Sequence, residues 1–255
     1  MQTVTITIRQ IGDVGEMRAV EELQKEVWGI PDLDVVPLTQ LVAAKEAGGT
    51  LIGAFDDEAL VGFVYGFPSF EFGRHAHHSH MLAVKPEYRN LDLGRRLKLA
   101  QREHVMAQGV GLITWTFDPL QSLNAHFNFN KLGVVADRYL RDFYGDEPAS
   151  FLHQTGTDRL WVSWLISTER VKNIIDGNAQ PGQVENADSI SIEIPGDINS
   201  LQRQQPRTAL RWREETRRAF MEAIQAGYVI VGFTRENNVG RYLLRPQITP
   251  ITQMS

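Results

Sequence analysis

The sequence predicts a mixed α/β fold, and three observations support this prediction. Alternating, β-branched runs that are typical of strands recur along the chain of 255 residues. Segments with apolar residues at helical spacing lie between these runs, and several of them end at glycine. Up to residue 167 the patterns follow one another as strand, two helices, hairpin, strand, helix, strand, helix and two strands, an order typical of a mixed sheet covered by helices.

The first elements have clear boundaries. Residues 4–10 (VTITIRQ) alternate and are rich in β-branched side chains, which predicts a strand. Residues 17–29 carry apolar side chains at helical spacing and stop at glycine, and residues 37–49 form a second helical pattern closed by two glycines. Residues 50–68 contain two apolar runs joined by an acidic turn, so they are expected to form a hairpin.

The middle of the chain alternates strand and helix. A strand over 78–86 ends at proline, and a helix follows over 93–109. The apolar run 111–119 is typical of a buried strand, and 120–132 is expected to be a helix closed by Gly133. The last two strands of this part are expected at 134–144 and 159–167.

A polar segment separates this part from a smaller one. Residues 173–189 are rich in Gly, Asn and Asp, as linkers are. Beyond them the patterns indicate a strand, a long helix and a hairpin, at 190–194, 206–226, 228–234 and 240–245. We therefore expect a domain over 1–168, a linker over 169–189 and a β-α-β-β extension over 190–255.

Composition excludes several functional classes. The net charge of −5 argues against a nucleic acid or an anionic membrane as partner. The chain has no cysteine, which excludes disulfides, thiolate metal sites and cysteine nucleophiles. No apolar run approaches the ~18 residues that span a bilayer, and the first ten residues lack the apolar core of a signal peptide. A cytoplasmic location is expected.

The turn between the strand at 78–86 and the helix at 93–109 is suited to bind phosphate. A strand that enters a helix through a tight turn directs free backbone N–H groups to one point, where the helix dipole adds positive charge. Gly94 permits close approach of the backbone, and local cations are present at Arg89, Arg95, Arg96 and Lys98. The alternative is an ordinary helix whose basic residues form a solvated face.

The same stretch, LAVKPEYRNLDLGRRL, resembles the strand-four signature of the GNAT (GCN5-related) N-acetyltransferase family. The matching positions are Leu82, Val84, Pro86, Tyr88, Arg89, Gly94 and Leu97. The first glycine of the family falls on Asp92. A carboxylate beside a diphosphate is unfavourable, so the side chain must turn outward, the loop must differ, or cofactor binding must be weaker.

A second stretch, SLNAHFNFNKLGV, resembles the family's other signature and keeps its register at Ala125, Leu132 and Gly133. Ser122 replaces the family's asparagine. Phe129 replaces the tyrosine that often protonates the leaving thiolate, so Tyr139, Tyr144 or solvent must substitute.

The resemblance covers roughly residues 1–168 and implies a GNAT acyltransferase fold whose central strands four and five splay apart. It also implies acetyl-CoA or another acyl-CoA as donor, with no metal. Main-chain groups of the strand would bind the pantetheine arm, at Leu82, Ala83 and Val84. The turn would hold the diphosphate, through Arg89, Asn90, Leu91, Asp92, Leu93, Gly94 and Arg95. Further contacts would come from Ser122, Asn124, Asn128 and Phe129.

Amides and arginines near this second stretch have two interpretations. Asn124 and Asn128 are four apart, so a regular helix would place them on one face. They bind pantetheine or substrate, or they serve as local caps on a polar surface. Arg138, Arg141 and Tyr144 lie on the next expected strand, where they are placed to bind a substrate carboxylate or to form surface ion pairs.

Four of the seven histidines lie within residues 75–80. In a strand His78 and His80 share one face and Ser79 points to the other. Imidazole titrates near neutrality, where general-base catalysis is most effective, so either histidine is a candidate to take a proton from an amine. The alternatives are a structural role and a metal site, and Glu71 is a further candidate base.

The sequence thus predicts an acyl-CoA-dependent N-acyltransferase that moves an acetyl or succinyl group to a small-molecule amine, such as an amino acid. The alternative is a non-catalytic GNAT-fold module that binds CoA or a protein partner. The helix at 206–226 has enough apolar surface to pack on the rest of the chain or on a second copy, which leaves a homodimer open.

Overall fold

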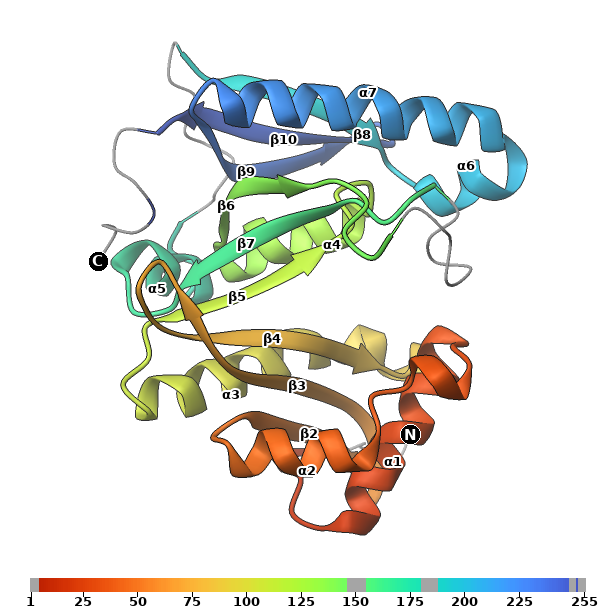
Figure 1. The fold of residues 1–255 in the computed structure, drawn as a ribbon, viewed down its shortest axis with the longest axis vertical. Coiled ribbons are helices and arrows are strands. Elements are labelled where there is room, and N and C mark those ends of the chain that lie inside the picture. Colours follow the sequence, from red (N-terminus) through yellow and green to blue (C-terminus); the bar gives the residue numbers. More distant parts are fainter. Residues whose placement is uncertain (1–4, 146–154, 180–187, 248–250, 252–255) are drawn as a thin grey trace. The chain divides into compact units, whose positions relative to one another are not determined.

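The computed structural model describes residues 5–145, 155–179, 188–247 and residue 251. The chain divides into two compact units, Met1–Thr114 and Trp115–Ser255, called unit 1 and unit 2 below. Each unit combines strands with helices, so the predicted mixed α/β class is confirmed (Figure 1).

Unit 1 is built on four antiparallel strands that follow one another in the sheet: β1 (Ile6–Gln10), β2 (Thr50–Asp56), β3 (Ala59–Glu71) and β4 (Arg74–Val84). The next strand, β5 (Leu112–Phe117), begins in unit 1 and pairs with β4 in parallel. Because β2, β3 and β4 are joined by short turns, sequential strands lie next to each other.

Helices cover both faces of this sheet. The first face carries α1 (Val14–Trp28) and α2 (Leu38–Glu46), joined through the 3₁₀ turn η1 (Asp32–Asp34). The opposite face carries α3 (Leu93–Ala107), which follows the 3₁₀ turn η2 (Pro86–Leu91). Local signals explain the ends of α1: the side chain of Asp13 accepts a hydrogen bond from the N–H of Glu16, and Gly29 closes the helix in the left-handed region.

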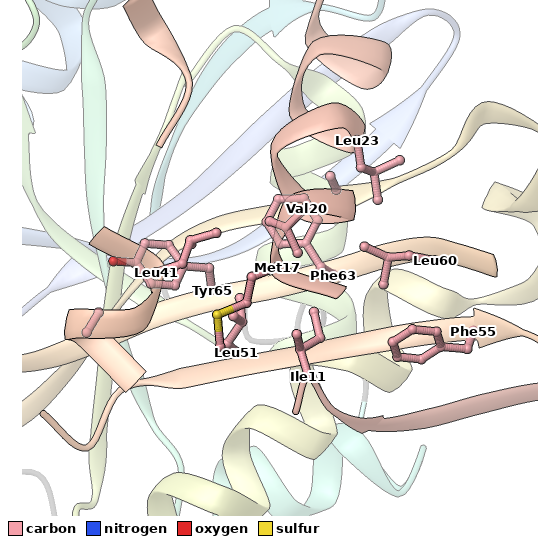
Figure 2. Close-up of a cluster of buried hydrophobic side chains, with 12 residues drawn as sticks. Ile11, Met17, Val20, Leu23, Leu41, Leu51, Phe55, Leu60, Phe63 and Tyr65 are labelled. Atoms are coloured by element: carbon pink, nitrogen blue, oxygen red, sulfur yellow. The ribbon is translucent and has the colours of Figure 1, made fainter. Parts of the chain in front are cut away.

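The alternation of β3 divides its side chains between two cores. Phe63 and Tyr65 belong to the cluster under α1 and α2, which Figure 2 shows together with Met17, Val20 and Leu41. Val64, which lies between the two aromatic residues, belongs to the opposite cluster with Leu93 and Leu97 of α3. Both faces of β3 are therefore buried, which explains its nearly continuous apolar run.

Unit 2 contains a second set of antiparallel strands in the order β7-β6-β9-β10-β8. Their bounds are Val135–Leu140 (β6), Arg159–Leu165 (β7), Ile190–Pro195 (β8), Tyr228–Glu236 (β9) and Val239–Pro246 (β10). The helices are α4 (Ser122–His126), the π-helical turn η3 (Phe127–Leu132), α5 (Glu169–Ile175), α6 (Ile198–Gln204) and α7 (Pro206–Gln225). Since β9 pairs with β6, the C-terminal extension shares a sheet with β6 and β7.

Several predicted boundaries within the first 145 residues differ from the structure by a few residues, and three of them bear on the candidate site. Strand β4 begins at Arg74 rather than at residue 78, since Phe72 and Gly73 form a left-handed turn that pairs the histidine run with β3. The helix expected over 120–132 begins at Ser122 and widens into η3. Strand β6 ends at Leu140 instead of 144, because Asp142 takes a positive φ of 45° and turns the chain.

The C-terminal part also differs from the prediction. Helix α5 occupies the start of the segment 169–189 that was expected to be a linker, and residues 180–187 of that segment lie outside the described residues, as does Val4 of the first predicted strand. The extension contains the additional helix α6, so its order is β-α-α-β-β. The division into domains at 168 and 190 stays a prediction. No helix in the described parts of the chain is both long and apolar enough to cross a membrane.

Candidate active site

Strand β4 carries a β-bulge at the histidine run. Ser79 lies opposite Gly66 and Met81 lies opposite Tyr65, so His80 is an extra residue without a counterpart on β3. A bulge of this kind interrupts the ladder and shifts the alternation of the side chains that follow it by one residue. The backbone at His80 is therefore the one place in this ladder where β4 departs from regular pairing with the middle of β3.

The two candidate bases lie on the same face of the sheet, as predicted. The rings of His78 and His80 are 6.4 Å apart, and the ring of Phe67 contacts both, at 5.5 Å and 5.8 Å between centroids. The ring of Tyr65 lies 6.0 Å from His80. Nδ1 of His78 shares a hydrogen bond of 3.1 Å with Oγ1 of Thr114.

The surroundings of His80 favour the free base. Although its ring reaches solvent, the aromatic side chains around it remove water from one side. This desolvation lowers the pKa of His80 from its ordinary value near 6.5. The imidazole is therefore uncharged at neutral pH, as a residue that accepts a proton must be.

The edge of β4 beyond the histidines is paired on one side within unit 1. The parallel pairing with β5 joins His77 to Ile113 and His78 to Thr114, the last residue of that unit. From Ser79 to Val84 the described residues of unit 1 supply strand pairing on the β3 side alone. The main-chain groups at Leu82, Ala83 and Val84, which were predicted to bind an extended arm, lie in this stretch.

The turn after β4 has the conformation that a glycine would adopt. Asp92 has φ 55° and ψ 25° in the left-handed region, where Asp is one of the few tolerated side chains, and it occupies the N-cap of α3 without making a capping hydrogen bond. Its carboxylate is 60% exposed and forms an ion pair with Arg95 at 3.5 Å. The side chain thus turns outward, as the sequence required if the family's loop shape is kept.

The first turn of α3 presents the expected phosphate-binding elements. Leu93 is buried and Gly94 is half-buried at the start of a helix of 15 residues, whose first N–H groups have no intrahelical acceptor. Arg89 is exposed and donates through Nε to the carbonyl of Val84 at 3.3 Å, which ties the cation to the end of β4. Asn90 and Leu91 are also exposed within η2.

Two of the predicted cations are engaged elsewhere. Lys98 is not part of a basic surface: its side chain is buried, and Nζ donates to Oγ of Ser79 at 2.7 Å. Its position on the apolar face of α3, one residue after Leu97, directs it into the sheet. Arg96 is exposed but donates to the carbonyl of Ile6 at 3.0 Å. The prediction that Lys98 supplies a phosphate-binding charge is therefore wrong.

Two of the predicted contacts in unit 2 are the amide side chains of Asn124 and Asn128. Asn124 is exposed, whereas Asn128 is buried and its Oδ1 accepts a hydrogen bond of 3.3 Å from Nε1 of Trp115. The expectation that these amides share a face is wrong, because the chain changes from α- to π-helical geometry at Phe127 and the i, i+4 relation no longer holds.

The other two predicted contacts of this stretch are buried. Phe129 is fully buried and its ring contacts Phe117 and Tyr242, so it fills the core of unit 2. Ser122 is 3% exposed, and its Oγ has no hydrogen-bond partner among the described residues. Of the two side chains, only that of Ser122 leaves a polar atom to be satisfied by a ligand or water.

Tyr139 is held by a buried carboxylate. Its hydroxyl donates to Oδ2 of Asp158 at 2.5 Å, and burial followed by this carboxylate raises the pKa of Tyr139. Arg217 binds the same carboxylate through two contacts of 2.7 Å. Burial alone would raise the pKa of Asp158, but hydrogen bonds from Arg217, the N–H of Asp142 and Tyr139 outweigh it and lower the pKa. A phenol in this setting is a poor proton donor.

Tyr144 lies in the turn after β6 rather than on a strand. Its side chain is exposed, its N–H donates to Oγ1 of Thr157 at 3.1 Å, and the guanidinium of Arg159 lies 5.1 Å from its ring. Arg141 pairs with the neighbouring Asp142, and Arg138 lies over the ring of Trp161. These three residues therefore do not form one row along a strand.

The predicted residues fall into separate units. The histidines, the β4 edge and the phosphate-binding turn lie in unit 1, while Ser122, Asn124, Asn128 and both tyrosines lie in unit 2. Glu71 ends β3 opposite Arg74. Among the described residues no group of three or more His, Asp or Glu side chains is placed to hold a metal ion.

Sequence reasoning missed two buried polar networks. One joins Ser79 and Lys98 to other polar side chains of unit 1, and the other surrounds Asp158 in unit 2. A signal for the first was present: Lys98 and Gln101 interrupt the apolar face of a helix whose buried positions include Leu93, Leu97 and Val105. Polar residues on such a face predict a buried partner.

The sequence and the fold were compared with known proteins. The model of the acetyltransferase (GNAT) family matches residues 16–134. The comparison with curated proteins found no match.

The fold resembles solved acetyltransferases at low sequence identity. The ribosomal-protein-S18-alanine N-acetyltransferase from Escherichia coli has a TM-score of 0.52 at 13% identity, covering 64% of this chain and 96% of its own. Aminoglycoside 6′-acetyltransferase type Ii has a TM-score of 0.50 at 19% identity, covering 64% and 99%. An acetyltransferase from Salmonella typhimurium, solved with its cofactor acetyl-CoA, has a TM-score of 0.50 at 15% identity, covering 65% and 96%.

These structures are covered almost completely, whereas about a third of this chain has no counterpart in them. The match of the family model over the β4 and α3 region agrees with the resemblance found in LAVKPEYRNLDLGRRL. Residues 16–134 therefore match the acetyltransferase (GNAT) family, and the fold resembles that of solved acetyltransferases.

Proposed function

We propose that the protein is an acyl-CoA-dependent N-acyltransferase that transfers an acetyl group to the amine of a small molecule. The observation that carries this proposal is the arrangement along β4. Uncharged His80 lies at a bulge, the strand edge beyond it is paired on one side within unit 1, and the strand leads into a helix N-terminus with a left-handed residue at its cap.

These residues fit an acyl-CoA. The main chain from Leu82 to Val84 suits the amides of a pantetheine arm, and the N–H groups at the start of α3 suit the diphosphate of CoA. The outward carboxylate of Asp92 and the half-buried Gly94 leave this approach open. Bound there, the thioester supplies the activated acyl group.

The reaction needs three tasks from the protein. His80 takes a proton from the acceptor ammonium, directly or through water, so that the nitrogen lone pair attacks the thioester carbon and a C–N bond forms. A backbone N–H of β4 donates to the carbonyl oxygen while it is negatively charged. The carbonyl then re-forms as the C–S bond breaks, the nitrogen gives up its second proton to solvent, and the thiolate takes a proton, so the products are the amide and free CoA.

Tyr139 is a poor source of this last proton, because it is bound to Asp158 and its pKa is raised, and Tyr144 stays a candidate from the sequence alone. Solvent is the other source. The side chain of Tyr144 is exposed.

The acceptor and the acyl group are less constrained. Structural relatives act on an aminoglycoside in one case and on an alanine of a ribosomal protein in another. The resemblance of the block around DPL, NA and KLG to enzymes suspected of acylating amino acids favours a small amine here, with succinyl-CoA as the second candidate donor. Homodimer formation and a cytoplasmic location stay predictions.

A second function has one observation in its favour. Phe129 occupies the position of the family's proton-donating tyrosine and is packed in the core, as expected for a module that binds CoA without turnover. A thiol-release assay separates the two functions: the protein is incubated with acetyl-CoA or succinyl-CoA and panels of amino acids of both hands and other amines. Amine-dependent release of CoA supports the enzyme. CoA binding without release for any amine supports the module.

A further inference from the structure

A buried polar network lies on the face of β4 opposite the candidate bases. Nζ of Lys98 donates to Oγ of Ser79 at 2.7 Å and to Oε1 of Gln101 at 3.3 Å. Nε2 of Gln101 donates to Oγ1 of Thr50 at 2.8 Å, and that hydroxyl shares a hydrogen bond of 3.0 Å with Nε2 of His77. All five side chains are at most 4% exposed.

The network is costly to bury and is not needed for ordinary helix–sheet packing. An apolar residue at 98 would continue the core that Leu93 and Leu97 form with the sheet. Burial lowers the pKa of Lys98 well below its ordinary value and, together with the Lys98 charge, lowers that of His77 to about 3. Polar groups retained at such a cost are often those that specify one conformation.

The strand opposite is shaped to accept the network. A Cβ atom at Gly66 would lie 2.4 Å from Nε2 of His77, 2.6 Å from the carbonyl oxygen of His78 and 3.0 Å from Nε2 of Gln101. No side chain other than hydrogen fits there. Gly66 is also the residue that pairs with Ser79, immediately before the bulge.

The location of Ser79 connects the network to the candidate active site. It is the last regularly paired residue before the extra residue His80, and its side chain points to the opposite face. A hydrogen bond that fixes Ser79 to α3 therefore fixes the start of the bulge. The bulge in turn sets the direction of the His80 side chain and of the adjacent backbone N–H.

We propose that Lys98 and Ser79 are positioning residues, whose hydrogen bond between α3 and β4 holds the bulge in the geometry that His80 needs for catalysis. The proposal rests on the proposed function, because it assigns the network a role in acyl transfer. It adds that these buried side chains act on the rate of the chemical step rather than on the binding of the donor.

The test compares Lys98→Met, Ser79→Ala and the double variant with the wild-type protein. Replacing both partners by apolar groups is close to neutral for stability, so the double variant keeps its fold even if a single one does not. Gln202→Met is the matched control, because it removes a buried side-chain hydrogen bond to Thr155 in unit 2.

Two readouts are needed. In the thiol-release assay kcat is expected to fall about tenfold or more in all three variants, since displacement of a reacting group by ~1 Å costs up to ~100-fold, while KM for the acyl-CoA stays within about twofold. The kcat of the double variant is expected to be no lower than that of the more affected single variant, because the two residues act as a unit. Carbon-bound proton signals of the His80 ring, observed by NMR at one pH, shift in all three variants and not in Gln202→Met.

The outcomes separate the two proposals. Variants with the kcat of the wild-type protein overturn the positioning role. Variants in which KM for the acyl-CoA and kcat are impaired to the same degree, while the His80 signals stay unchanged, also overturn it. If the wild-type protein releases no CoA with any amine, the proposed function fails. The NMR comparison still decides the placement of His80 in that case: shifted signals support it and unchanged signals overturn it.

Discussion

The carboxylate of Asp158 provides the sharpest test of the energetics in unit 2. Its side chain is fully buried and accepts hydrogen bonds from Arg217, from the hydroxyl of Tyr139 and from the N–H of Asp142. Asp158→Asn keeps the shape of the side chain but removes its charge. Arg217 then loses the more buried of its two carboxylate partners.

The size of the effect follows from the geometry. Removing one partner of a buried ion pair costs about 3–5 kcal/mol, and the lower value applies because Arg217 is 20% exposed. With about 2–4 °C per kcal/mol for a unit of this size, the melting temperature falls by about 6–12 °C. Thermal unfolding followed by circular dichroism or calorimetry at pH 7 measures this shift.

The control is an ion pair of similar length at the surface. Arg241 and Glu193 are 2.8 Å apart, but their side chains are 39% and 49% exposed. Glu193→Gln is expected to cost less than about 1 kcal/mol. Equal shifts in the two variants would refute the reasoning that burial makes the Asp158 pair important.

The pH dependence of stability is a further test of the role of Asp158. Since the pKa of Asp158 is lowered in the folded protein, its contribution is complete above the ordinary value near 3.9 and is lost as the pH falls through the folded-state value. The difference in stability between wild-type protein and Asp158→Asn should therefore shrink on acidification below about pH 4. A difference that grows there contradicts the assignment.

Three further predictions concern unit 1. His80→Ala should lower kcat more at pH 7 than at pH 9, where the amine loses its proton unaided, and an unchanged pH profile counts against His80 as base. Gly66→Ala should lower the free energy of unfolding in urea by about 1–3 kcal/mol through its clash with His77, and an unaltered midpoint contradicts the packing. Asp92→Gly, which keeps the left-handed turn and removes a carboxylate, should tighten CoA binding a few-fold at low salt and less at high salt. Calorimetric titration that finds weaker binding refutes this.

The regular elements of unit 1 were predictable from the sequence. Helix α1 and strand β3 have apolar residues at the period of their own geometry, and local signals such as Gly29 mark where they end. The outward side chain of Asp92 was one of three possibilities that the sequence left open, and its left-handed backbone is visible only in the structure.

The bulge and the networks were not predictable in this way. The register of β4 depends on which β3 residue lies opposite, so the extra residue at His80 is visible only in the paired strands. From its residue type alone, Lys98 was predicted to be a surface cation. Its position on the helix instead directs its side chain to Ser79.

In unit 2 the difficulty is distance along the chain. Tyr139 lies on β6, Asp158 directly precedes β7, and Arg217 lies on α7. Tyr139 and Asp158 are 19 residues apart in the chain, and Asp158 and Arg217 are 59 residues apart. No local pattern joins them. The π-helical turn likewise breaks the i, i+4 rule that paired Asn124 with Asn128.

The binding of a diphosphate at the first turn of α3 is tested most directly by the affinity of the protein for CoA when that turn is blocked. Calorimetric titration with CoA compares the wild-type protein with Gly94→Glu, and with Ala107→Glu as a control that adds the same charge at the exposed end of the same helix. We expect CoA to bind the wild-type protein and Ala107→Glu alike, and we expect binding to folded Gly94→Glu to be lost. Equal affinity in all three proteins would contradict the claim that the diphosphate binds at this turn.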